Sequence, residues 1–69
     1  MKVGEIYKPK PGEGHQYLEI TWVSEDGSMC ELVFVTTGYH YGKVFTELVL
    51  EYNQLVPKKE AEFVRLLYV

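Results

Sequence analysis

The chain has 69 residues, of which 46% are hydrophobic and 14% aromatic, and its formal net charge is −3. This length predicts one domain over residues 1–69, and the apolar content is typical of a folded chain rather than a disordered one. One cysteine excludes an internal disulfide, and no apolar run approaches the roughly 18 residues that a membrane span needs. We therefore expect a cytoplasmic protein that does not enter the membrane.

The N-terminal part predicts a short strand followed by a loop. Residues 3–7 alternate apolar and polar side chains, with Ile6 toward the core. Residues 8–14 contain two prolines and two glycines, which remove backbone donors and permit unusual dihedral angles. No GKS or GKT sequence follows, so we expect a connecting loop rather than a phosphate-binding loop.

Residues 16–37 carry the strongest pattern, two alternating strands joined by a turn at residues 24–28. The Asp26-Gly27 pair in this turn is a strong hairpin signal, because glycine accepts the positive φ of a tight turn. The side chains predicted to share the apolar face are Leu18, Ile20, Trp22, Cys30, Leu32 and Phe34. An isolated hairpin is only marginally stable, so the remaining chain must cover this face.

Residues 36–43 predict an exposed turn that is rich in aromatic rings. Gly38 and Gly42 bracket Tyr39, His40 and Tyr41. Exposed aromatic side chains with no role in folding are typical of binding hot spots, so we expect these three residues to contact a partner. Tyr17 is predicted at the rim of the same site. The alternative is that Tyr39 or Tyr41 folds back to cap an open barrel end.

After a strand at residues 43–46, the apolar spacing changes to that of a helix. Leu48, Val49, Tyr52, Leu55 and Val56 lie on one face of a helix near residues 47–56. Thr46 is the expected N-cap and Pro57 the stop signal. A strand extension over residues 47–52 is the alternative.

The C-terminal residues 61–69 predict a closing strand that is apolar on both faces. Such two-sided apolarity indicates burial, contact with a partner chain, or instead a terminal helix that begins at Pro57. An apolar edge at residues 63–69 makes a homodimer an alternative function, because small domains gain stability by association.

Residues with catalytic or metal-binding chemistry are few. Cys30, His15 and His40 match no metal-ligand spacing, and Cys30 lies on the predicted apolar face. Glu19 and Glu31 could share one face of the hairpin, but such acids also mark a solvated sheet face. A domain this small has little room for an enclosed pocket of roughly 300 Å³. We therefore expect no enzymatic activity, no metal and no cofactor.

Binding of nucleic acid is a further alternative, carried by Lys8, Lys10 and Lys43 beside the aromatic residues Tyr39 and Tyr41. Affinity for nucleic acid depends on cationic contacts to phosphates, so the negative net charge disfavours it. A protein partner is the stronger expectation.

The order of elements resembles an SH3-like β-barrel. The segment Gly4-Glu5-Ile6-Tyr7, the hairpin, and Thr37-Gly38-Tyr39-His40-Tyr41-Gly42 look like small uncharacterised barrels encoded by bacteriophages and mobile elements, over about residues 3–56. The ALYDY-like segment and paired tryptophans of eukaryotic SH3 domains are absent, so recognition of proline-rich ligands is not implied.

This resemblance implies a mainly β fold, a small SH3-like antiparallel barrel of about five strands with one short helix near residues 47–56. It also implies a non-enzymatic interaction module, such as a phage-type inhibitor of a host protein or defence system. Docking is expected through the aromatic loop at residues 38–43.

Overall fold

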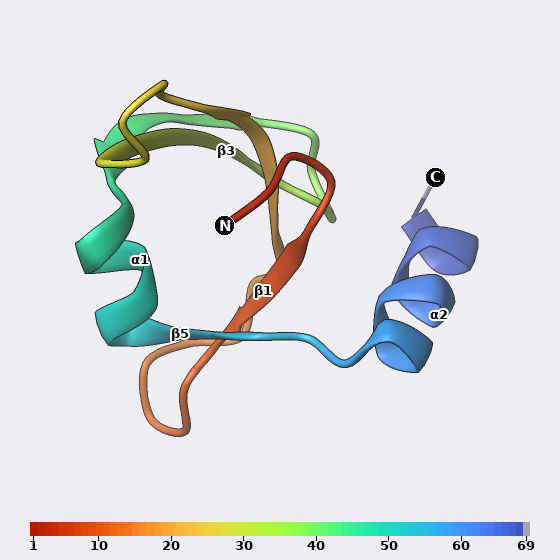
Figure 1. Ribbon diagram of the computed structural model, residues 1–69. Helices are drawn as coiled ribbons and strands as arrows, with labels where there is room; N and C mark the ends of the chain where they lie inside the picture. The colour runs from red at the N-terminus through yellow and green to blue at the C-terminus, as the bar shows by residue number, and fades with distance from the viewer. Residues whose placement is uncertain (69) are drawn as a thin grey trace.

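The computed structural model describes residues 1–68, and within them the chain forms five strands and two helices. In chain order these are β1 (Ile6–Pro9), β2 (Leu18–Val23), β3 (Met29–Phe34), β4 (His40–Phe45), α1 (Thr46–Tyr52), β5 (Asn53–Leu55) and α2 (Lys58–Tyr68). The strands form one antiparallel sheet in the order β4-β3-β2-β1-β5. The sheet curls but does not close, and α1 and α2 lie on opposite sides of β1 (Figure 1). The prediction of a mainly β chain is confirmed.

The predicted hairpin is present as β2 and β3. Ser24 donates its backbone N–H to the Met29 carbonyl (2.8 Å), and Gly27 takes a positive φ of 77° in the turn. The carboxylate of Asp26 accepts hydrogen bonds from Ser24 and Ser28, which hold the turn in place. The Asp-Gly signal therefore identified the turn correctly.

A bulge in β2 changes the face of Trp22. Ile20 lies opposite Leu32, but Trp22 lies opposite Glu31, so Thr21 is an extra residue. The alternation restarts after the bulge: Val23 packs against the core, whereas Trp22 remains 39% exposed. The prediction that Trp22 shares the apolar face is wrong for this reason.

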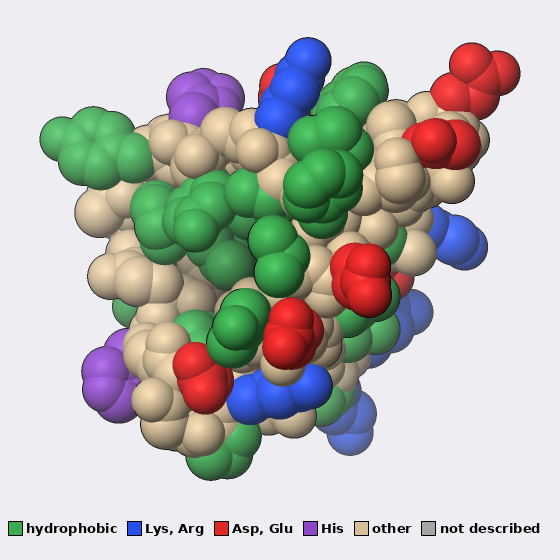
Figure 2. All heavy atoms as spheres, turned by 90° about the vertical axis from the view of Figure 1, so that its left-hand side faces the viewer, with side chains coloured by type: hydrophobic (Ala, Val, Ile, Leu, Met, Phe, Trp, Pro, Cys, Tyr) green, Lys and Arg blue, Asp and Glu red, His purple; other side chains and the backbone are tan. Residues whose placement is uncertain are grey.

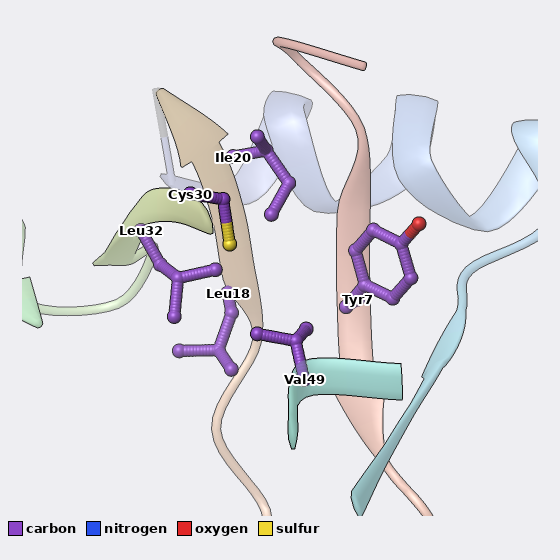
Figure 3. Packing of buried hydrophobic residues seen from close by; sticks show 6 residues of the cluster. All are labelled: Tyr7, Leu18, Ile20, Cys30, Leu32 and Val49. Atoms are coloured by element: carbon purple, nitrogen blue, oxygen red, sulfur yellow. The ribbon is translucent and has the colours of Figure 1, made fainter. Parts of the chain in front are cut away.

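The sheet buries apolar side chains on both faces. On the inner face, six side chains converge between the hairpin, β1 and α1 (Figure 3); they are Tyr7, Leu18, Ile20, Cys30, Leu32 and Val49. We call these six residues the first cluster. On the other face, Ile6 packs with Val56, Ala61 and Val64, which together form the second cluster. Ile6 and Tyr7 are adjacent in β1 and point to opposite faces, so this strand belongs to both clusters.

Strand β1 lies later in the chain than predicted, beginning at Ile6 and including Lys8 and Pro9 of the expected loop. The register explains why a proline fits here. The N–H of Lys10 donates to the Tyr52 carbonyl and the N–H of Val56 donates to the Ile6 carbonyl. By alternation, the Pro9 nitrogen points toward β2, and the pairing of β1 with β2 ends at Tyr7, so no ladder bond is lost.

Helix α1 is confirmed over residues 47–52, which contradicts the alternative strand there. It is shorter than the predicted 47–56, because Asn53–Leu55 leave the helix and pair with β1 as β5. Phe45, not Thr46, is the N-cap residue, and the Thr46 hydroxyl instead donates to the Gly27 carbonyl (2.8 Å).

The closing strand predicted over residues 61–69 is wrong. Residues Lys58–Tyr68 form α2, the helix that was the alternative, and Val69 lies outside the described residues. Ala61 and Val64 face the second cluster, while Phe63, Leu66 and Leu67 point to solvent. The fifth strand of the sheet is β5 instead. In the part of the chain that the structure describes, neither helix has the length and apolar character to cross a membrane.

Candidate functional site

An apolar groove of about 340 Å³ lies between the inner face of the sheet and α1. Its lining residues are Glu13, Leu18, Leu32, Tyr41, Val44, Leu48, Val49, Tyr52 and Asn53. Figure 2, which views the molecule from the side of α1, shows apolar side chains gathered on this face with acidic side chains beside them. The groove is therefore an apolar surface whose border carries acidic side chains, with Lys or Arg side chains further along the same face.

The groove exists because the sheet stays open between β4 and β5. The chain passes from β4 directly into α1 at Thr46, and α1 rather than a strand spans the gap. Val49 closes the inner end, since it is buried in the first cluster. Leu48 and Tyr52 lie on the same side of α1 but remain about half exposed, at 46% and 48%.

The predicted aromatic residues lie beside this groove rather than in a free loop. Tyr39 precedes β4, whereas His40 and Tyr41 are its first residues. Tyr41 is an extra residue in the pairing of β3 with β4, because Leu32 lies opposite Gly42 and Val33 opposite His40. The side chains of Tyr39 and Tyr41 are 73% and 54% exposed.

Tyr41 connects the aromatic segment to the groove. Its ring makes an edge-to-face contact with Phe34, with ring centroids 5.5 Å apart, and it also lines the groove. This contact partly matches the alternative that Tyr41 folds back onto an open end of the sheet. Tyr39 and His40 remain exposed and do not line the groove.

Tyr17 has a structural position on the other face of the sheet. Its ring packs against the second cluster, and its hydroxyl donates to the Glu60 carboxylate (2.8 Å). This hydrogen bond raises the pKa of Tyr17. The structure therefore does not place Tyr17 at the rim with Tyr41.

The three lysines of the nucleic-acid alternative are not brought together. Lys8 forms an ion pair with Glu60 (2.9 Å), and Lys43 lies 5.1 Å above the ring of Trp22. Lys10 is exposed beyond the end of β1. Because β1 and β4 are separated in the sheet by two strands, these cations do not form one phosphate-binding surface.

A different group of cations borders a second hollow of about 380 Å³, where Lys2, Lys58 and Arg65 are among the lining residues. The Arg65 guanidinium donates a hydrogen bond to the Gly4 carbonyl. Sequence reasoning missed this group because its members are far apart along the chain.

The residues considered for catalysis or metal binding are not brought together in the described part of the chain. Cys30 is fully buried, and burial raises the pKa of its thiol, which keeps it protonated. Glu19 lies opposite Val33 and Glu31 opposite Trp22, so the two acids do not form a direct pair. Over residues 1–68, no cluster of three His, Cys, Asp or Glu side chains could hold a metal ion.

Sequence reasoning also missed the groove residues Val44, Leu48 and Tyr52 as site residues. The helical spacing of Leu48 and Tyr52 was a signal, but it predicted only that they share one face of a helix. Their partial exposure depends on the open side of the sheet, which the sequence pattern did not reveal.

The fold and this surface define a small open-sheet β protein with an apolar groove beside α1. Comparisons with protein-family models, curated proteins and solved structures find no match to this chain. The geometry of the groove is therefore the basis for assigning a function.

Proposed function

We propose that this protein is a non-enzymatic protein-interaction module that docks a partner at the groove between β4 and α1. The observation that carries the proposal is the pairing of an apolar groove with two half-exposed tyrosines, Tyr41 and Tyr52, at its border. Tyrosine buries a large area at a small cost in side-chain entropy, which favours it at binding sites. Tyr39 and His40 lie next along the chain and extend the proposed contact surface.

The architecture that we propose is SH3-like. The strand order, with a short helix between β4 and β5, supports this description, although the sheet is open. A phage-type inhibitor of a host protein or defence system is the role that the sequence resemblance implies. Identification of the partner tests that role.

The experiment is capture of partners from the source cell with the intact protein as bait, quantified by mass spectrometry. We expect the Tyr41→Ala/Tyr52→Ala double variant to lose the proteins that the unchanged chain enriches. Tyr68→Ala is the matched control, because Tyr68 is an exposed tyrosine (46%) on α2, away from the groove. Equal capture by both variants would contradict the proposed site.

A homodimer is a second candidate, favoured by the outer face of α2. Phe63, Leu66 and Leu67 form an exposed apolar stripe at helical spacing, and Leu66 is 83% exposed. Light scattering over a concentration series should then show a dimer that Leu66→Glu/Leu67→Glu dissociates. A monomer at every concentration would reject this candidate.

A further inference from the structure

The free edge of β4 lies directly beside the groove. In an antiparallel pair, successive residues point their backbone groups alternately toward and away from the partner strand. Thr46 donates its N–H to the Ser28 carbonyl (3.0 Å), and Cys30 lies opposite Val44. The register therefore points Val44 toward β3 and points the N–H groups of Lys43 and Phe45 outward.

No strand covers these outward groups in the described part of the chain, since β4 ends the sheet order. Unpaired N–H and C=O groups at a sheet edge are a template for another extended chain. The side chain of Val44 lines the groove, together with Leu48 and Tyr52 of α1. A strand that paired with β4 would place every second side chain over the same apolar surface.

The charges near the groove favour a cationic occupant. Glu13 lines the groove, and Glu47 and Glu51 are exposed on α1 beside its groove-lining residues. Figure 2 shows acidic side chains next to the apolar ones on this face, with Lys or Arg side chains at its upper and lower margins. The cation on β4 itself, Lys43, is directed to the ring of Trp22.

We infer that the groove binds a basic, apolar segment of a partner in extended conformation, which adds to β4 as a further strand. This inference rests on the proposed function and names its partner class. The side chains of the segment that point into the groove are apolar in its middle and Lys or Arg at its ends, where they face Glu13, Glu47 and Glu51. Main-chain hydrogen bonds to Lys43 and Phe45 fix its register.

The probe is a fluorescein-labelled peptide with the sequence Lys-Thr-Val-Thr-Val-Thr-Lys, capped at its C-terminus, which places Lys and Val on the same face of an extended strand. Binding is measured by fluorescence polarisation with the full chain. We expect the affinity for the peptide to fall as the salt concentration rises. The counterpart peptide with Glu in place of Lys should not bind. Equal binding of both peptides would overturn the charge argument.

N-methylation of the peptide backbone tests strand addition. In a paired strand only alternate N–H groups face the neighbour, so methylation of one alternate set should weaken binding by roughly tenfold or more per site. Methylation of the other set should be tolerated. Equal sensitivity or equal tolerance of the two sets would overturn the edge-strand geometry.

Two results separate this inference from the proposed function. If Tyr41→Ala/Tyr52→Ala abolishes partner capture but the labelled peptide does not bind, the interaction site stands and strand addition fails. If the protein alone is a dimer and the dimer dissociates when the peptide binds, a second copy of this chain occupies the edge of β4. The inferred partner class is then wrong.

Discussion

The carboxylate of Asp26 is the clearest example of a side chain whose chemistry follows from one turn. It accepts hydrogen bonds from the Ser28 backbone N–H (3.0 Å) and from the hydroxyls of Ser24 and Ser28 (both 2.8 Å). These bonds favour the charged form and lower the pKa of Asp26 from 3.8 to about 2.

We expect an NMR titration to show this lowered pKa and Ser28→Ala to raise it toward 3.8. Because the folded-state pKa is lowered, the stabilisation by Asp26 is present above pH 3.8 and is lost as the pH falls toward about 2. An unchanged pKa in the Ser28→Ala variant would contradict a contribution from the Ser28 hydroxyl, since the variant keeps the backbone N–H of residue 28.

Core and surface side chains should respond differently to truncation. Leu32 is 1% exposed, so Leu32→Ala should lower the free energy of unfolding by about 2–5 kcal/mol. Tyr39 is exposed, and Tyr39→Ala should change it by no more than about 0.5 kcal/mol. Denaturant unfolding measures both, and similar losses would show that Tyr39 belongs to the core.

At the residue scale, alternation predicted most of the inner face of the hairpin. It placed Leu18, Ile20, Cys30 and Leu32 correctly, and all four are buried. It failed at Trp22, because the bulge at Thr21 shifts the register. The residues around Thr21 contain no sequence signal that predicts a bulge. Tyr17 was misplaced because its partner, Glu60, is 43 residues away in sequence.

At the scale of elements, α2 is held to the sheet by polar contacts as well as by the second cluster. Glu60 accepts hydrogen bonds from Lys8 and Tyr17, and these lower its pKa from 4.5. The contribution of charged Glu60 is therefore present above pH 4.5 and is lost as the pH falls through its lowered folded-state pKa.

We expect the α2 amides to lose hydrogen-exchange protection earlier than those of β2 as the solution is acidified. Glu60→Gln removes the titrating group, so hydrogen-exchange protection of the α2 amides in this variant should not fall over the same acidic pH range. If the variant loses protection over the same pH range, another group controls the docking of α2.

The two faces of α2 should also differ in their effect on stability. Val64 is 1% exposed against the second cluster, so Val64→Ala should cost roughly 1–3 kcal/mol. Leu66→Ala, on the solvent face, should change the free energy of unfolding by less than about 0.5 kcal/mol for a monomer. A larger loss for Leu66→Ala than for Val64→Ala would contradict the observed helix orientation.

The sequence could not decide between helix and strand for this element, since apolar residues occupy both of its faces. Val64 and Leu66 fit a strand alternation, while Ala61, Val64 and Tyr68 also fit helical spacing. The outcome depends on tertiary contact: β5 already pairs with β1, and the remaining apolar surface of Ile6 is covered by a helix.

At the scale of the whole molecule, the hairpin and the mainly β class were predictable from local pattern and turn chemistry. The groove was not, because it depends on β5 pairing with β1 across most of the chain and on α1 filling the gap beside β4. Local periodicity contains no information about whether a curled sheet closes.

Hydrogen exchange at β4 tests the open edge most directly. If β4 is a free edge, the amide of Val44, which faces β3, should be protected, while the amides of Lys43 and Phe45 exchange at nearly unprotected rates. Strong protection of Lys43 and Phe45 in a dilute, monomeric sample would show that the edge is already covered. That result would contradict an open site beside the groove.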